Sequence, residues 1–255
     1  MKNDNSEKSG FISHLIELRQ RLINSFIFLF SFFVVCYFFS EEIYSFLVQP
    51  YADAVKDDNV NRRLIFTALQ ETFLTYLRVS FFAALFVSSP IILIQIWKFI
   101  APGLYKNEKK AILPYLIATP ILFLFGGMLV YYLIMPLAIK FFLSFEASSI
   151  NSALPIQLEA KVNEYLSLVM KLIFAFGLSF QLPVILSLLA RVGFVDSVFL
   201  KERRKYVVFI IFVAAAILTP PDPITQIGLA IPLLILYELS IFSVKIIEKR
   251  KNKNA

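Results

Sequence analysis

The sequence has 255 residues, of which 58% are hydrophobic and 16% aromatic, including 28 Phe but only seven Gly and one Trp. This apolar share exceeds the roughly half that soluble domains contain, so the excess has to face lipid. The formal net charge of +7 comes from Lys and Arg beside the ends of apolar runs, not from one basic face, which argues against nucleic-acid binding. We therefore predict an all-α, polytopic membrane protein.

Six apolar runs approach the roughly 20 residues that a helix needs to cross the hydrocarbon. We predict spans at roughly 22–39, 73–100, 112–137, 165–190, 206–218 and 227–243, in a single membrane domain over residues 1–255 with a basic cytoplasmic tail at 245–255. The fifth run gives roughly 20 Å of helix against a hydrocarbon core of about 30 Å. We expect short fifth and sixth helices that thin the membrane locally.

Prolines mark two structural points between these spans. Pro220 and Pro221, followed by Asp222, separate the last two runs, and we expect a tight hairpin turn because such a segment cannot continue a helix. In the loop between the first two runs, a short apolar stretch at 43–48 is followed by Pro50. We expect a cap at the membrane interface there, with Pro50 redirecting the chain.

The distribution of Lys and Arg predicts the orientation. Eighteen of the 25 Lys and Arg residues lie at the N-terminus, between spans two and three, between spans four and five, or at the C-terminus. Positive residues are retained on the cytoplasmic side, so both termini are predicted to be cytoplasmic. No internal repeat relates the two halves, which weakens a secondary-transporter interpretation.

The residues that catalysis would need are missing from the membrane. The only histidine, His14, precedes the first span, none of the six aspartates lies in a span, and no phosphate-binding loop occurs. The single cysteine, Cys36, allows no intrachain disulfide. We predict a protein that is not an enzyme and that holds no cofactor or metal, so the energy for any transport must come from an ion gradient or a partner.

An amphipathic helix start precedes the first span. Its apolar residues recur at helical spacing, which places Glu17 and Arg21 together on another face. At this i,i+4 spacing the two form a surface pair of a few tenths of a kcal/mol.

This segment begins a series of motifs that extends through the chain. They are SHLIELRQRL at 13–22, SPIILIQIWKFIAPGLYKNEKK at 89–110, YLS at 165–167, FAFG at 174–177, LTPPD at 218–222 and AIP at 230–232. In this order the motifs resemble the TatC family, the multispanning core of the twin-arginine (Sec-independent) protein translocase. Six spans with both ends inside also resemble that family.

The resemblance implies specific site residues and partners. TatC proteins recognise the paired arginines of a signal peptide on cytoplasmic carboxylates, and the matching positions are Glu17 and Glu108, with Phe99 and Leu104 at the ends of a flanking apolar surface. A carboxylate accepts the planar guanidinium fork in bidentate geometry, which lysine does not match. Without the resemblance, a helix-surface pair for Glu17 and a solvated, lysine-neutralised carboxylate for Glu108 are favoured. The resemblance further implies proton-motive force, single-span TatA- and TatB-like partners, membrane lipid, homo- or hetero-oligomers and a location in the cytoplasmic (inner) membrane.

Four polar side chains interrupt the spans: Arg78, Lys171, Gln181 and Glu238. Arg78 and Lys171 lie near outer ends, and we expect them to extend toward the interface. Gln181 occupies a position where the TatC pattern usually carries a glutamate, and an amide does not titrate. We expect Gln181 and Glu238 to share one polar patch that binds a partner helix, with hydrogen bonding inside the bundle as the alternative for Gln181.

Two rival functions stay open at this point. A secondary transporter or ion channel is supported only by the intramembrane polar groups, and a membrane assembly scaffold is the other alternative. Small single-span proteins encoded by neighbouring genes would favour the translocase.

Overall fold

The computed structural model describes residues 3–56, 62–104, 113–146, 157–219 and 223–254. Within these ranges the chain is helical, apart from turns, short extended segments and one isolated β-bridge. The helices are α1 (Asn3–Phe38), α2 (Ser40–Ala54), α3 (Glu71–Leu104), α4 (Leu113–Leu129), the π-helical turn η2 (Val130–Ile134), α5 (Met135–Leu143), α6 (Val162–Ser179), α7 (Leu182–Val192), α8 (Ser197–Glu202), α9 (Arg204–Leu218) and α10 (Pro223–Asn254).

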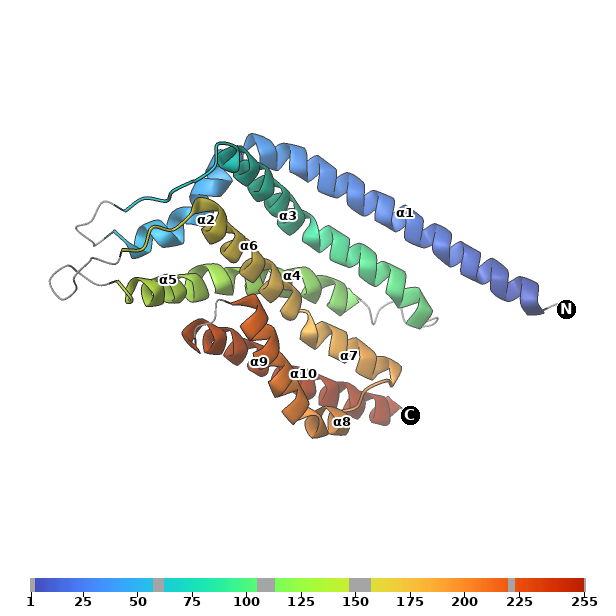
Figure 1. Ribbon diagram of the computed structural model, residues 1–255. Helices are drawn as coiled ribbons and strands as arrows, with labels where there is room; N and C mark the ends of the chain where they lie inside the picture. The colour runs from blue at the N-terminus through green and yellow to red at the C-terminus, as the bar shows by residue number, and fades with distance from the viewer. Residues whose placement is uncertain (1–2, 57–61, 105–112, 147–156, 220–222, 255) are drawn as a thin grey trace.

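The helices form an elongated bundle with two distinct ends. Figure 1 shows both chain termini at one end, which we call the termini end, and α2 at the opposite end, which we call the α2 end. Helix α1 runs beside α3 along most of its length, whereas α10 packs against α7 and α9. The two termini therefore lie at the same end, as the positive residues predict.

Among the described residues, five stretches are long and apolar enough to cross a membrane, and each overlaps one predicted span. They lie in α1, in α3, in α4 to α5, in α6 to α7 and in α10. The remaining helix, α9, has only 15 residues, which confirms the short fifth helix. Helix α10 has 32 residues and continues into the basic tail, so only the fifth of the two helices is short. Pro220, Pro221 and Asp222 lie outside the described residues.

Pro50 does not redirect the chain, and this expectation is wrong. Helix α2 continues through Pro50 to Ala54, although a proline lacks the N–H that the carbonyl four residues earlier needs. That carbonyl, on Phe46, accepts a hydrogen bond from the Tyr131 hydroxyl at 2.7 Å. The next carbonyl, on Leu47, accepts one from the Tyr165 hydroxyl at 3.1 Å. Two tyrosines from distant helices thus stabilise the proline-containing helix.

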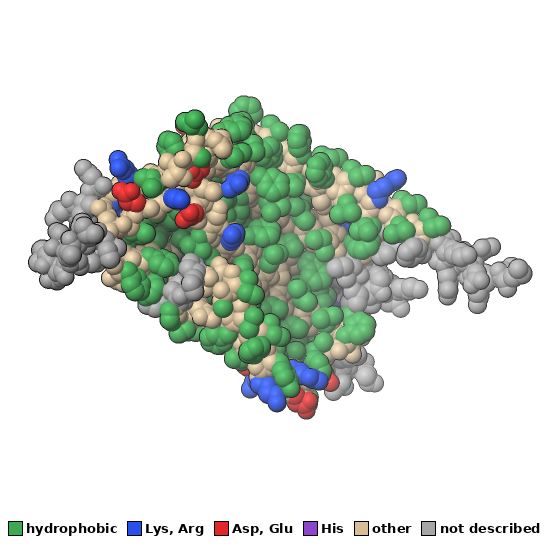
Figure 2. Space-filling model, viewed as in Figure 1, with side chains coloured by type: hydrophobic (Ala, Val, Ile, Leu, Met, Phe, Trp, Pro, Cys, Tyr) green, Lys and Arg blue, Asp and Glu red, His purple; other side chains and the backbone are tan. Residues whose placement is uncertain are grey.

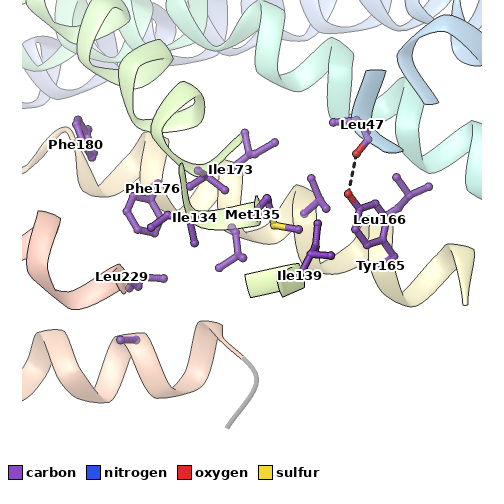
Figure 3. Close-up of a cluster of buried hydrophobic side chains, with 14 of the residues drawn as sticks. Leu47, Ile134, Met135, Ile139, Tyr165, Leu166, Ile173, Phe176, Phe180 and Leu229 are labelled. Atoms are coloured by element: carbon purple, nitrogen blue, oxygen red, sulfur yellow. Dashed lines mark hydrogen bonds between the residues drawn. The ribbon is translucent and has the colours of Figure 1, made fainter. Parts of the chain in front are cut away.

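The hydrophobic core lies where η2, α5 and α6 meet. Figure 3 shows that side chains from these elements point toward one another, with Leu47 of α2 at one edge and Leu229 of α10 on another side. Met135, Leu166 and Phe176 are essentially inaccessible. This core joins the third and fourth spans to the two short helices α2 and α9.

Glycines allow α4 and α6 to cross in direct backbone contact. A Cβ atom added to Gly126 would lie 2.8 Å from the carbonyl oxygen of Phe176, and one added to Gly177 would lie 2.7 Å from the Phe123 ring. Small residues at such crossings are the usual means of close helix packing in membranes. The crossing fixes the depth of α6 within the bundle.

The fourth span breaks between α6 and α7. Pro183 lacks the N–H that the carbonyl of Ser179 would accept, and the helix stops at that residue. Gln181 lies in this break, between the end of α6 and the start of α7. Helix α7 then ends at Gly193, whose φ of 91° is the left-handed conformation that glycine adopts most readily.

The loops at the α2 end are joined by a largely buried ion pair. Arg62 donates from both terminal nitrogens to the Glu146 carboxylate, at 2.5 and 2.7 Å, and the backbone N–H of Leu158 donates to the same group at 2.7 Å. The backbone N–H of Ile65 donates to the carbonyl of Ala160 at 3.1 Å, and the N–H of Val162, the first residue of α6, donates back to the carbonyl of Ile65 at 2.9 Å. This end is therefore rigidly joined.

Candidate functional site

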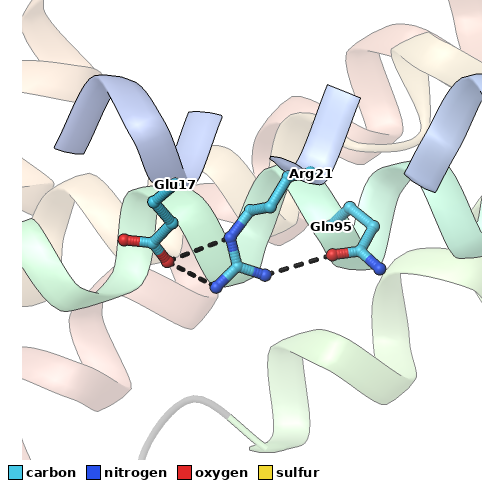
Figure 4. A network of polar contacts seen from close by, with 3 residues as sticks. All are labelled: Glu17, Arg21 and Gln95. Atoms are coloured by element: carbon cyan, nitrogen blue, oxygen red, sulfur yellow. Dashed lines mark hydrogen bonds and ion pairs between the residues drawn. The ribbon is translucent and has the colours of Figure 1, made fainter. Parts of the chain in front are cut away.

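A three-residue polar network joins α1 to α3 near the termini end. The Glu17 carboxylate accepts two hydrogen bonds from Arg21, from Nε at 3.0 Å and from Nη2 at 2.5 Å. The remaining terminal nitrogen of Arg21 donates to Oε1 of Gln95 on α3 at 3.1 Å. Figure 4 shows the guanidinium between the carboxylate and the amide. A carboxylate and an amide thus hold a guanidinium at this point of the bundle.

The network is open to its surroundings on the Glu17 side. The side chains of Arg21 and Glu17 are 23% and 35% exposed, so the ion pair is only partly shielded from solvent and contributes little to stability. In Figure 4 the second carboxylate oxygen of Glu17 points away from Arg21. A partly exposed carboxylate in this position has the chemistry needed to accept a further donor.

An apolar groove of about 460 Å³ lies between α3 and α7. Ile96 and Trp97, the two residues that follow Gln95, line it from α3, and Leu188 and Leu189 line it from α7. A groove with this lining accommodates an apolar chain, and its α3 wall begins beside the polar network. The amide of the polar network and one wall of the apolar groove therefore lie on the same helix, α3, while the carboxylate is on α1.

Gln181 and Glu238 do not share a polar patch, and this expectation is wrong. The amide nitrogen of Gln181 donates to the carbonyl of Thr119 on α4 at 3.0 Å, and the side chain is buried. Glu238 is exposed and pairs with Arg204 of α9 at 2.6 Å. The two groups face different neighbours because α7 and α10 meet through another contact, between the hydroxyls of Ser187 and Ser243 at 2.8 Å.

Comparisons with known proteins identify the family. The sequence model described as "Sec-independent protein translocase protein (TatC)" matches residues 13–232. The chain belongs to the TatC family. The Sec-independent protein translocase protein TatC of Magnetococcus marinus is 49% identical over 98% of this chain and 89% of its own length. That of Escherichia coli is 36% identical over 91% and 86%, respectively.

A solved structure agrees with the fold. The crystal structure of a twin-arginine translocase receptor, TatC, superposes with a TM-score of 0.78 at 35% identity, covering 92% of this chain and 99% of the other. The chain is accordingly a multi-pass membrane protein. As a member of the TatC family it is a component of a protein translocase, which makes it a transport protein and not a classical enzyme. TatC is part of a translocase that works with other Tat subunits.

The structure describes some of the predicted signal-binding residues and not others. Glu17 and Phe99 are described, and Phe99 is half-buried on the last turns of α3. Leu104 is the last residue of α3, but its side chain is not described. Glu108 lies outside the described residues.

Sequence reasoning missed Gln95. It lies between Ile94 and Ile96 in an apolar span, so an intramembrane amide was present as a signal, but we did not count it among the polar groups of the spans. Its partner is a residue of another helix, and local spacing carries no information on that pairing. The predicted Glu17–Arg21 pair, by contrast, is formed.

Proposed function

We propose that this chain is the signal-peptide-recognising core of the twin-arginine translocase and exports folded proteins across the cytoplasmic membrane, with both termini cytoplasmic and the proton-motive force as the energy source. The observation that carries the proposal is the Glu17 carboxylate, partly exposed and already in contact with a guanidinium. Glu108 is the second carboxylate in this proposal, and the surface from Phe99 to Leu104 holds the apolar part of the peptide.

The site has the chemistry for arginine over lysine. The contact between Glu17 and Arg21 uses two guanidinium nitrogens on one carboxylate oxygen, an arrangement that a single ammonium group does not reproduce. Arg21 thus occupies one oxygen of the carboxylate in the absence of a peptide, and a signal arginine has to share Glu17 with its existing partners or displace them. Either route requires the charge of Glu17.

The test is a binding titration of the full-length protein with a fluorescent twin-arginine peptide. Glu17→Gln and Glu108→Gln each remove one charge-assisted hydrogen bond, which costs about 1.5–3 kcal/mol, so affinity should fall roughly ten- to a hundredfold. Glu42→Gln, an exposed carboxylate at the α2 end, is the matched control and should bind normally. Equal affinity of the unmutated protein for twin-arginine and twin-lysine peptides would refute the proposal.

Arg21→Gln separates recognition from structure. If Glu17 serves only to hold Arg21, Glu17→Gln and Arg21→Gln break the same ion pair and have the same effect. If Glu17 binds the peptide, removing Arg21 takes away an internal competitor, and affinity should stay constant or rise. Opposite responses of the two variants support recognition, and matching losses support the structural role.

We also propose that Gln181 contacts a helix of a TatA- or TatB-like partner. The support is its buried amide oxygen, for which no hydrogen-bond partner exists within the described residues, a condition that costs about 1–3 kcal/mol. Gln181 also lines the groove between α3 and α7, from which a donor can approach. Glu238 is satisfied by Arg204, and we assign the partner contact to Gln181.

Co-purification of the single-span subunits tests this second contact. Gln181→Leu should weaken assembly or export while peptide binding through Glu17 and Glu108 stays normal. Gln181→Glu should be tolerated, since its carboxyl offers an acceptor at the same place. Normal export by the Leu variant would make Gln181 a structural residue only.

A further inference from the structure

Two cationic side chains interrupt a second apolar groove at the membrane-facing surface. Arg78 of α3 and Lys171 of α6 both line a groove of about 680 Å³, whose other walls include Phe33 of α1, Phe81 of α3 and Phe174 of α6. In Figure 2, blue side chains stand within the green surface over the region where Figure 1 places α3 and α6. The signal-binding proposal uses neither of these cations.

The depth of the two cations places them inside the membrane. Arg78 follows the start of α3 by seven residues and Lys171 follows the start of α6 by nine, which is about 10 and 13 Å along the helices. Both helices belong to membrane-spanning stretches, so the cations lie in the half of the bilayer at the α2 end. A charge at such a depth is costly without a partner.

No carboxylate of the described residues forms an ion pair with Arg78 or Lys171. The Nη1 of Arg78 donates to the neutral amide oxygen of Asn163 at 2.6 Å. Lys171 is exposed and has no ion-pair partner among the residues that the structure describes. Among the described residues, the two positive charges of the groove therefore have no carboxylate partner, and an anion from the surrounding lipid would neutralise them.

The nearby carboxylates are engaged elsewhere. Glu71 accepts hydrogen bonds from the backbone N–H groups of Thr67 and Ala68, at 2.8 and 3.3 Å. Glu164 pairs with Lys161 at 3.7 Å in an exposed position. Both carboxylates line a polar notch of about 250 Å³ beside the groove, where Lys161 offsets the charge of Glu164.

Arg78 connects the two hollows. It lines the polar notch at the α2 end and also the apolar groove below it. Passing inward from the α2 end, the surface is first polar, then cationic at Arg78 and Lys171, and then apolar. This sequence of surfaces matches the headgroup, phosphate and acyl chain of a phospholipid.

We propose that Arg78 and Lys171 bind the phosphate of an anionic phospholipid from the leaflet at the α2 end, whose acyl chain occupies the groove. The acyl chain supplies no preference, because leaving bulk lipid for an apolar groove gains no hydrophobic free energy. Selection comes from the two charges: the guanidinium fork matches a phosphate in geometry, and the ammonium adds a second point charge. This proposal stands independently of signal recognition.

Native mass spectrometry of the full-length protein tests the site. Phosphatidylglycerol and phosphatidylcholine with identical acyl chains are added separately, and the ratio of lipid-bound to free protein is measured. We expect phosphatidylglycerol to be favoured, and Arg78→Gln and Lys171→Gln each to reduce that preference about fivefold, the effect of one cation near a lipid surface. Lys140→Gln, which removes an exposed lysine of α5 away from the groove, should leave it unchanged.

Further variants and outcomes keep the test decisive. Arg78→Lys keeps the charge but not the planar fork and should retain more of the preference than Arg78→Gln, whereas equal retention of the two lipids by both Arg78 variants, with unfolding shifted from that of the unmutated protein, would assign the effect to altered folding and overturn the proposal for Arg78. Lys171 is exposed, so its Gln variant reports binding without a folding defect. Equal retention of the two lipids by the unmutated protein overturns the site. If the double Gln variant binds phosphatidylglycerol as well as the unmutated protein does but loses a single-span subunit, the proposal is also overturned, and the groove is a protein interface.

Discussion

The α2 end and helix α1 are built in opposite ways. At the α2 end, a largely buried ion pair and two tyrosine hydroxyls join loops and helices that are far apart in sequence. Helix α1 packs mainly on α3 and leaves Phe26 and Phe30 exposed. Regions with few buried contacts open most readily. The difference indicates that the α2 end is joined to several parts of the bundle, whereas α1, which carries Glu17, is held mainly through its contact with α3.

Removing Arg62 should have the largest effect on the anchored end. Arg62→Ala leaves the Glu146 carboxylate, only 18% exposed, without its ion-pair partner, and loss of one member of a buried pair destabilises by about 3 kcal/mol. Denaturant unfolding of the protein in detergent measures this change. Arg63→Ala, which alters an exposed neighbour, is the control. Equal stability of the two variants would show that the ion pair does not hold this end together.

Acid should weaken the same end. Hydrogen bonds from Arg62, with a further bond from the Leu158 N–H and the nearby guanidinium charge, lower the pKa of Glu146 below its ordinary value. Because the folded-state pKa is the lower one, the stabilisation is present above the unfolded-state pKa and is lost as the pH falls through the folded-state pKa. Thermal unfolding should therefore show a steeper acid loss for the unmutated protein than for Glu146→Gln. Parallel pH profiles would exclude Glu146 as the titrating group.

The tyrosine contacts to α2 should have an intermediate effect. Tyr131→Phe leaves the Phe46 carbonyl without its donor, and Tyr165→Phe removes the side-chain donor to the Leu47 carbonyl, which costs about 1 kcal/mol apiece. The stacking of Tyr131 on Phe46, at a centroid distance of 4.4 Å, survives in a Phe variant. Tyr132→Phe, at an exposed position, is the control. Unfolding of the single and double variants shows whether the two bonds act together, and unchanged stability of all three would remove their role at Pro50.

The smallest effect is expected on α1. Phe30→Ala truncates a side chain that is 58% exposed, and changes at such positions usually alter the free energy of unfolding by less than about 0.5 kcal/mol in detergent. Phe123→Ala, at a fully buried position, should cost about 3–5 kcal/mol in the same assay. Similar losses for the two variants would contradict the comparison between α1 and the rest of the bundle.

The elements of the fold that depend on local pattern were predictable from the sequence. Apolar length located the spans, and the i,i+4 spacing predicted the pairing of Glu17 with Arg21, which the structure contains. The short fifth helix followed from its residue count. These features require no knowledge of which helices lie side by side.

Features that depend on packing between helices were not predictable in this way. Pro50 stays inside α2 because hydroxyls of Tyr131 and Tyr165 reach the carbonyls around it, and neither tyrosine is near it in sequence. Glu238 has a depth comparable to that of Gln181 along its helix, but the rotation of α10 directs it to Arg204. The depth of a residue follows from its position along its own helix. The direction in which its side chain points depends on how neighbouring helices pack against that helix.

The glycine crossing of α4 and α6 restricts where cargo can travel. With Gly126 against the backbone of Phe176, these two helices leave no room for water or an extended chain between them, and a small folded domain is about 30 Å across. Parting them would break the core around Phe176. Under the proposed function, cargo therefore does not pass between α4 and α6.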